Sequence, residues 1–257
     1  MQLVLSRNYH DSPPDHSASV GPMTTWWEDL HVPLSAEAAM LLDDVEAAHR
    51  AQDPPSWPAP DDDPRDEDYG VCADPGRFRM IIDRCRAWAR VLEERGWADV
   101  TRGRMGEEDW LITLRPRREG ALALRLQGAA WIFPDGRAPM VEVLVGEIRS
   151  RVGVHPDCAC DACDWGSAAF IDSLDQDIFS VVDGSFRIIR KDGMRWTETS
   201  FGAGGTATRE TVREVHGVSW ADHWESRTPF SVARRDLPPW PPAGFDDPPE
   251  DWPADGR

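Results

Sequence analysis

The chain has 257 residues, a formal net charge of −18, 40% hydrophobic residues and 22 prolines. The charge argues against a nucleic-acid partner, because phosphate contacts require clustered lysine and arginine, and against an anionic membrane surface. The hydrophobic content suffices for one core, whereas the prolines and glycines predict segments outside it. A basic protein partner or a cation is the electrostatic complement of such a chain.

The cysteines and the N-terminus indicate a cellular compartment. Three of the five cysteines lie too close together for a conventional disulfide framework. The N-terminus has no basic region followed by a long apolar core, so no signal peptide is expected, and no apolar run is long enough to span a bilayer. We therefore expect a cytoplasmic protein whose thiols are free or bound to a metal.

Residues 1–65 are predicted to form an N-terminal arm that contains one short helix and an acidic, proline-rich linker. Ser35 is a suitable N-cap for the helix. Its weak apolar face consists of Met40, Leu41, Leu42 and Val45. Prolines remove hydrogen-bond donors from residues 53–68 and the aspartates repel one another, so this linker should be extended and solvated.

The strongest helical pattern begins at Asp74, an N-cap that is followed by Pro75 in the first helical position. Apolar residues recur there at three- and four-residue steps: Phe78, Ile81, Ile82, Cys85, Trp88, Ala89 and Leu92. The opposite, polar face carries Arg79, Asp83, Arg86, Arg90 and Glu93. Gly96 should end the helix in a left-handed conformation, and Cys85 should be a buried thiol.

From Trp97 to Ile148 the hydrophobic period is that of strands. The predicted strands are 110–115, 121–127, 130–133 and 140–148. Turn residues separate them, among them Gly128 and the run 134–136. Short gaps between successive strands favour an antiparallel meander over parallel crossovers.

A second helix is predicted from Gly166 to about Val182. Its apolar stripe consists of Phe170, Ile171, Leu174, Ile178, Val181 and Val182. Four residues are expected to face water: Asp172, Asp175, Gln176 and Asp177. A hairpin with an Asp192-Gly193 turn follows, then a second turn at 202–205 and a third strand at 206–215.

These elements together predict an α+β protein in which two main helices pack on an antiparallel sheet, a meander plus a hairpin. The α+β domain should span residues 66–235. Residues 236–257 are rich in proline, tryptophan and acidic side chains, which predicts a disordered tail.

The loop between the meander and the second helix carries the most distinctive chemistry. His155, Cys158, Cys160 and Cys163 offer four zinc ligands within nine residues. The fourth ligand could instead be His216 or His223. Three thiolates with one histidine would make a closed, structural zinc site, whereas a missing ligand would leave an open, catalytic position. The neighbouring aspartates 157, 161 and 164 would offset the charge of a cation.

Two other interpretations of this loop remain open. Cys160-Asp-Ala-Cys163 precedes a helix, whose N-terminus favours a reactive thiolate, although the nearby aspartates oppose it. Thioredoxin-like redox proteins also require a parallel sheet, whereas an antiparallel one is expected here. In the remaining interpretation, the cysteines only pack the loop and bind nothing.

Several motifs along the chain carry a resemblance. Asp68-Tyr69, the helix start 74–78, the Cys-x-Cys-Asp-Ala-Cys-Asp loop and the run 181–186 (Val-Val-x-Gly-Ser-Phe) resemble an uncharacterised domain-of-unknown-function family from high-GC soil bacteria. The resemblance covers roughly residues 66–235. It implies a single small α+β domain with the cysteine loop on its surface, and it implies no catalytic residues.

No nucleophile elbow and no His-Glu-x-x-His zinc motif occurs in the sequence. The sequence therefore predicts a non-enzymatic binding or accessory protein with a structural zinc loop. One alternative is a thiol-redox or zinc-dependent enzyme that uses the same cysteines. Another is an interaction module that acts through the Trp-Pro tail.

Overall fold

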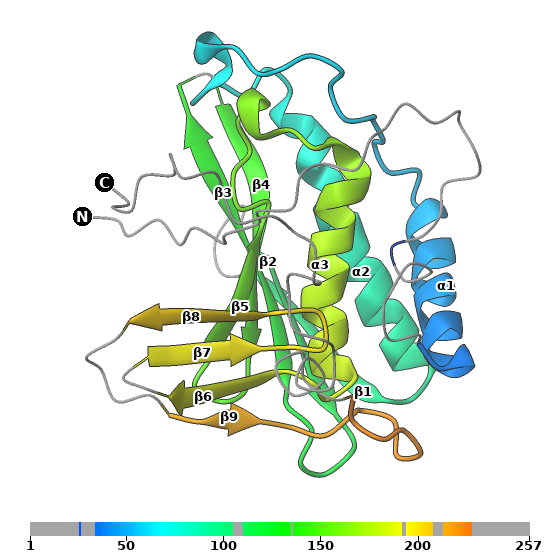
Figure 1. The fold of residues 1–257 in the computed structure, drawn as a ribbon. Helices are drawn as coiled ribbons and strands as arrows, with labels where there is room; N and C mark the ends of the chain where they lie inside the picture. The colour runs from blue at the N-terminus through cyan, green and yellow to red at the C-terminus, as the bar shows by residue number, and fades with distance from the viewer. Residues whose placement is uncertain are drawn as a thin grey trace, which may run out of the picture.

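The computed structural model (Figure 1) describes residue 26 and residues 34–104, 110–134, 136–191, 194–207 and 213–227. These residues form three α-helices, nine strands and three short 3₁₀ turns. All strand pairs are antiparallel, so the predicted α+β class is confirmed. None of the described helices is both long enough and apolar enough to cross a membrane. The predicted tail, 236–257, lies outside the described residues, as do most residues before 34.

The first sheet is an antiparallel meander, as predicted, with strand order β1-β2-β3-β4-β5, but its two outer strands were not among the predicted ones. Its strands are β1 (Ala98–Arg104), β2 (Trp110–Pro116), β3 (Leu124–Phe133), β4 (Gly136–Val145) and β5 (Ser150–His155). The turn predicted at Gly128 is wrong, because β3 runs straight through it. A Cβ at this position would lie 2.3 Å from Nε1 of Trp110, so the glycine leaves room for the indole ring.

The second sheet has the order β8-β7-β6-β9 and follows the end of α3 (Figure 1). Its strands are β6 (Arg187–Lys191), β7 (Met194–Glu198), β8 (Ala203–Ala207) and β9 (Val215–His216). Lys191 pairs with Met194, which confirms the hairpin. The turn predicted at 202–205 is wrong, because Gly204 and Gly205 belong to β8 and pair with β7. Because glycine has no side chain, a strand that contains these glycines shows no alternation of hydrophobic residues in the sequence.

Two helices cover the first sheet, and the third packs on one of these helices from outside (Figure 1). Helices α2 (Arg79–Glu94) and α3 (Gly166–Val182) lie against the sheet, and α1 (Ala36–Arg50) packs on α2. Ser35 caps α1 as predicted, since its Oγ accepts a hydrogen bond from the Ala38 amide at 3.2 Å. Leu41, Leu42 and Val45 are fully buried, whereas Met40 is 59% exposed. The hydrophobic core thus includes residues of three helices, one more than the two main helices predicted.

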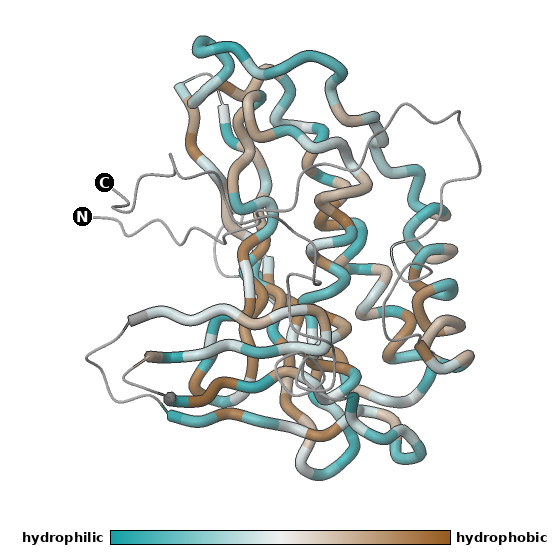
Figure 2. The backbone as a smooth tube through the Cα atoms, viewed as in Figure 1, coloured by the Kyte–Doolittle hydropathy of each residue, from teal (hydrophilic) through white to brown (hydrophobic). Residues whose placement is uncertain are grey.

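The segment between α1 and α2 is mostly hydrophilic (Figure 2). Residues 59–67 are exposed, as predicted for a solvated linker. Trp57 is an exception: it is half-buried and packs edge-on against Phe78 with ring centroids 5.8 Å apart. The helix predicted from Asp74 begins instead as a 3₁₀ turn, Pro75–Phe78, and the Asp74 side chain caps no backbone amide. Gly96 (φ +70°) ends α2 as predicted, and Cys85 is fully buried.

Two aspartates of α3 that were predicted to face water are buried. Asp175 is fully buried and accepts hydrogen bonds from Arg84 Nε at 2.9 Å and Nη2 at 2.5 Å. A third guanidinium nitrogen, Nη1, reaches Oε2 of Glu46 at 2.6 Å, so Arg84 joins all three helices. Asp177 is also buried and bonds to His155. The prediction failed because α3 is covered on two sides, by the sheet and by α2, and each buried carboxylate has a cationic or imidazole partner.

Candidate metal centre

The loop between β5 and α3 gathers three cysteines. The Sγ atoms of Cys158, Cys160 and Cys163 lie within 4.8 Å of one another, and Cys158 donates a hydrogen bond to Cys160 with sulfurs 3.2 Å apart. All three are free thiols. Cys160 is buried and the other two are half-buried. In the part of the chain that the structure describes, this is the one group of three metal-ligating side chains so closely spaced.

Backbone amides surround these sulfurs. Cys160 lies just before the 3₁₀ turn Asp161–Cys163, and its carbonyl accepts the Cys163 amide at 3.0 Å. The backbones of Gly70 and Cys163 donate hydrogen bonds to the Cys160 sulfur, and the backbone of Cys160 donates to that of Cys158. Amide hydrogen bonds stabilise a thiolate, so the loop is built to carry negative charge on sulfur.

The three thiols differ in acidity. Burial alone would raise the pKa of Cys160, but the hydrogen bonds from Gly70, Cys158 and Cys163 together lower it below its usual value. Burial raises the pKa of Cys158. The pKa of Cys163 is also raised, by burial and by the hydrogen bonds that it donates to the other two sulfurs. Cys160 is therefore the most acidic of the three thiols.

Arg77 holds the cysteine loop in place. Its guanidinium contacts Asp161 Oδ1 at 3.0 Å and Asp164 Oδ2 at 3.1 Å. It also lies 5.2 Å from the ring centroid of Trp57 and 5.0 Å from that of Phe78. Two of the three carboxylates expected to offset the charge of a cation, those of Asp161 and Asp164, are therefore already paired with an arginine.

Both ends of the 3₁₀ turn are tied to distant segments. The Ala73 amide donates to Asp161 Oδ2 at 2.9 Å, and the Trp57 indole donates to Asp164 Oδ1 at 2.9 Å. Asp164 also accepts the Gly166 amide at 2.8 Å, at the first residue of α3. The loop is thus ordered by the protein itself.

Sequence reasoning did not single out Arg77 or Trp57 as part of this site. The sequence nevertheless contains a signal for Arg77. The positive end of the helix dipole disfavours a cation in the first turn of the predicted helix, so Arg77 required an acidic partner elsewhere. Trp57 in an otherwise exposed linker was a second signal, because a large aromatic side chain seldom stays fully in solvent.

The structure does not bring His155 into the cluster. His155 is buried, and its Nε2 lies 2.8 Å from Oδ2 of the buried Asp177. A Cβ on Gly153 would lie 1.9 Å from the same oxygen, so the glycine makes room for this pair. The two alternative ligands lie farther off. His216 is exposed on β9, beyond the opposite end of α3 (Figure 1), and His223 Nε2 bonds to Glu37 at 2.6 Å.

The sulfur spacing can be compared with the requirements of zinc. Tetrahedral Zn²⁺ with Zn–S bonds of about 2.3 Å places its sulfurs about 3.8 Å apart. The Cys158–Cys160 pair, at 3.2 Å, would open slightly, and the other pairs, at most 4.8 Å apart, would close by up to about 1 Å. Side-chain rotations alone cover such changes. Three thiolates also suit the preference of Zn²⁺ and Cu⁺ for soft ligands.

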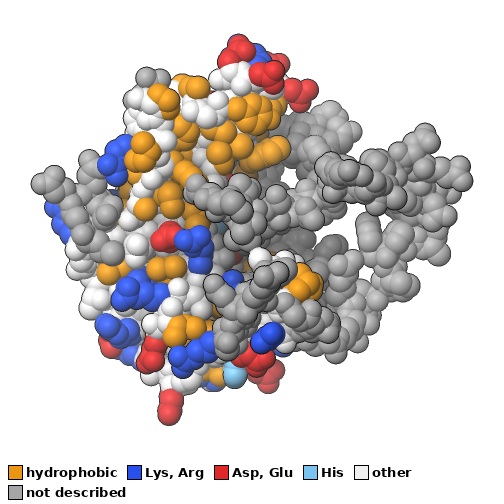
Figure 3. Space-filling view, turned by 90° about the vertical axis from the view of Figure 1, so that its left-hand side faces the viewer, with side chains coloured by type: hydrophobic (Ala, Val, Ile, Leu, Met, Phe, Trp, Pro, Cys, Tyr) orange, Lys and Arg blue, Asp and Glu red, His pale blue; other side chains and the backbone are white. Residues whose placement is uncertain are grey.

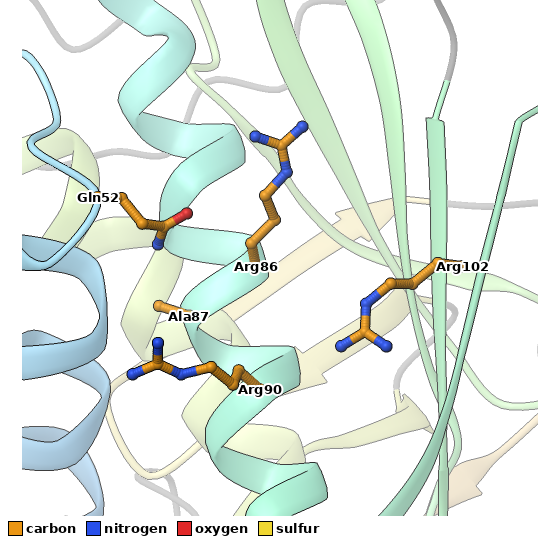
Figure 4. A pocket seen from close by; sticks show the side chains of 5 residues that line it. All are labelled: Gln52, Arg86, Ala87, Arg90 and Arg102. Atoms are coloured by element: carbon orange, nitrogen blue, oxygen red, sulfur yellow. The ribbon is translucent and has the colours of Figure 1, made fainter.

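A hollow of about 290 Å³ lies beside α2, apart from the cysteine loop (Figure 4). Its lining consists of Gln52, Arg86, Ala87, Arg90 and Arg102. Each arginine has a carboxylate partner: Asp83 at 3.0 Å, Glu94 at 3.5 Å and Glu93 at 2.9 Å, respectively. The guanidinium groups point in different directions (Figure 4), so they do not converge on one anion.

Comparison with known proteins gives a family and no activity. A family model described as "Family of unknown function (DUF6226)" matches residues 43–251. Searches of curated proteins and of solved structures returned no match. The matched span contains the cysteine loop and begins within α1, upstream of the 66–235 span that the sequence motifs indicated. The chain belongs to this family of unknown function, DUF6226.

Proposed function

We propose that this protein is a non-enzymatic accessory protein whose cysteine loop holds a structural Zn²⁺ through Cys158, Cys160 and Cys163. The observation that carries the proposal is the convergence of three sulfurs within 4.8 Å, in a loop fixed by Arg77. Packing alone does not explain three half-buried or buried thiols that point at one another in a polar loop. Because thiolate ligands need a reducing compartment, the proposal places the protein in the cytoplasm.

His155 is the fourth ligand in this proposal. Its Nε2 is occupied by Asp177, so Nδ1 is the nitrogen that remains for a metal. A ligand histidine typically donates its other ring N–H to a carboxylate, which fixes its tautomer and orientation, and Asp177 would serve as that carboxylate. Since His155 lies outside the thiol cluster, the 155–158 segment must move to close the site. The closed shell would then join the end of β5 to the start of α3.

Metal analysis of the purified protein tests the proposal. We expect about one equivalent of zinc in the wild-type protein and less than about a tenth in the Cys158→Ser/Cys160→Ser/Cys163→Ser variant. Cys85→Ala is the matched control, because Cys85 is a fully buried thiol outside the cluster, and it should keep its zinc. A wild-type protein that stays below a tenth of an equivalent after reconstitution with zinc and dialysis contradicts the proposal.

A His155→Gln variant separates the structural site from an open, catalytic one. The structural proposal predicts weaker zinc binding and an altered visible spectrum of the Co²⁺-substituted protein. If zinc content and the Co²⁺ spectrum stay the same, solvent occupies the fourth position. The alternative function, a zinc-dependent enzyme that uses the same cysteines, would then be favoured.

Thiol-redox chemistry is the other enzymatic alternative, and the 3.2 Å separation of the Cys158 and Cys160 sulfurs favours it. Equilibration in glutathione buffers at cytoplasmic potentials, followed by thiol titration, tests it. A reversible loss of two thiols, absent in Cys160→Ser, supports a redox centre. The tail alternative concerns residues outside the described part of the chain. It predicts that removing residues 237–257 leaves the fold intact and abolishes binding to a partner.

A further inference from the structure

Exposed hydrophobic side chains concentrate around the cysteine loop. The described residues include six large hydrophobic side chains that are strongly exposed: Met40, Tyr69, Val71, Ile132, Ile148 and Trp165. Three of them, Tyr69, Val71 and Trp165, lie in this loop or in the segment hydrogen-bonded to it. Trp165 is 69% exposed and Tyr69 is 59% exposed. Such grouping differs from the single, scattered apolar residues of an ordinary surface.

A backbone hydrogen bond joins the two segments that carry these side chains. The Asp161 amide donates to the Val71 carbonyl at 2.8 Å, which fixes residues 69–73 beside the 3₁₀ turn. Trp165 directly follows Asp164, which Arg77 holds. Tyr69, Val71 and Trp165 thus come from two segments that meet at the cysteine loop, and we call these three side chains the apolar patch.

An acidic rim borders this patch. Residues 61–68 contain six acidic residues and one arginine, and Asp61, Asp62, Asp63, Asp66 and Glu67 are exposed. The end of this run, Asp66–Asp68, contacts the turn Asp161–Cys163. Figure 3 shows a tip with several acidic side chains above a gathering of hydrophobic ones. Because residues 66–68 contact the turn just before Trp165, the acidic rim and the apolar patch are neighbours on one surface.

We propose that this surface docks a basic polypeptide segment of a protein partner. Apolar side chains of the segment pack on Trp165 and Tyr69, and its lysines and arginines face the 61–68 rim. Arginine is favoured next to the aromatic rings, because its guanidinium stacks on them while it pairs with a carboxylate. The rim repels nucleic acids and anionic membranes, so neither fits this surface.

The surface is organised before a partner arrives. Arg77, Trp57 and Ala73 hold the loop through ion pairs and hydrogen bonds. A preformed surface loses little conformational entropy on binding, which favours affinity. These contacts involve no metal ligand, so this inference goes beyond the zinc proposal and does not depend on it.

Selection of a random peptide library on the full-length protein tests the inference. We expect the enriched peptides to combine arginine or lysine with aromatic or aliphatic residues. A synthetic copy of an enriched peptide should bind Trp165→Ser and Tyr69→Ser at least about tenfold more weakly than wild type, because aromatic residues at the centre of an interface dominate its affinity. Asp62→Lys/Asp63→Lys should also weaken binding and reduce its salt dependence.

Met40→Ser and Asp43→Lys are the matched controls, because both residues are exposed on α1, away from the patch. Both should keep wild-type affinity within about twofold. The inference is overturned if no peptide is enriched, if the enriched peptides are acidic, or if Trp165→Ser binds them as well as wild type does. A dimer that Trp165→Ser converts to monomers also overturns it, since a second copy would then be the occupant. Normal peptide binding by the triple cysteine variant would uphold this inference even if the zinc proposal failed.

Discussion

Arg84 and Arg77 each bridge two carboxylates, but they do so in different surroundings. Arg84 is fully buried and joins Glu46, on α1, to Asp175, on α3. Arg77 is 17% exposed and joins Asp161 to Asp164 within one loop. The first arginine connects elements that already share a hydrophobic core, whereas the second orders a polar loop that has little core of its own. The same ion-pair motif therefore serves global stability in one region and local order at the candidate site in the other.

Breaking the Arg84 bridge should have the largest effect. Arg84→Met removes the guanidinium from Asp175 and leaves its buried carboxylate beside the Trp88 indole nitrogen, 2.7 Å away. We expect the free energy of unfolding to fall by about 3–5 kcal/mol, because a buried charge loses its counter-ion. Urea denaturation measures this loss. A loss below about 1 kcal/mol would contradict the role of this bridge in global stability.

Breaking the Arg77 bridge should cost less stability and more metal affinity. Arg77→Met removes hydrogen bonds at a half-buried site, so we expect the free energy of unfolding to fall by about 2 kcal/mol. Zinc affinity should fall by about 10–100-fold, as happens when groups that orient metal ligands are removed. Chelator competition measures the affinity. If Arg84→Met lowered the zinc affinity of the folded protein by the same factor as Arg77→Met, the Arg77 bridge would have no special role in ordering the cysteine loop.

Asp172, near the Arg84 bridge, provides a pH test of the same region. Burial, with a contribution from Asp175, raises the pKa of Asp172 to about 7, although Arg84 opposes the shift. The folded state therefore binds the proton more tightly than the unfolded state, so this group's contribution to stability falls as pH rises from about 4 to 7. A shift of this size corresponds to about 4 kcal/mol, but solvent screens the half-buried Asp172 and reduces the effect. Asp172→Asn should therefore be more stable than wild type at pH 8, by about 1 kcal/mol, and the difference should vanish near pH 4. Urea denaturation at both pH values checks this, and a pH-independent difference would contradict it.

Arg65 is a third arginine that contacts two carboxylates, and its substitution should have the smallest effect on stability and zinc affinity. Arg65 contacts Glu67 at 3.0 Å and Asp68 at 2.9 Å, and its side chain is 69% exposed. Because solvent screens exposed ion pairs, Arg65→Gln should leave both the unfolding midpoint and the zinc affinity unchanged. A measurable loss of zinc affinity would mean that the acidic rim, and not only Arg77, orders the cysteine loop.

These regions also differ in how far the sequence predicts them. Regular periodicity fixes α3 at Gly166–Val182 and the antiparallel meander, and both are confirmed. Local spacing likewise brings Cys158, Cys160 and Cys163 together, since residues so close along a tight loop have few other arrangements. What the sequence could not predict depends on long-range partners. Asp175 and Asp177 look solvent-facing on a helical pattern until Arg84 and His155 are placed beside them.

The surroundings of His155 illustrate the same limit. Three residues of separation place His155 near Cys158 along the chain, but the direction of its ring depends on Asp177, 22 residues farther on. Likewise, Gly128 and Gly205 resemble turn residues in the sequence, although each makes room for a tryptophan ring in a strand. In each case the deciding contact comes from a strand or helix outside the local pattern.

X-ray absorption at the zinc edge of the reconstituted protein tests the central claim most directly. The account predicts three sulfur ligands at about 2.3 Å and one nitrogen at about 2.0–2.1 Å. The nitrogen should be lost in His155→Gln, and the sulfurs in the triple cysteine variant. A shell made only of oxygen and nitrogen, or one that persists unchanged without the three cysteines, would contradict it.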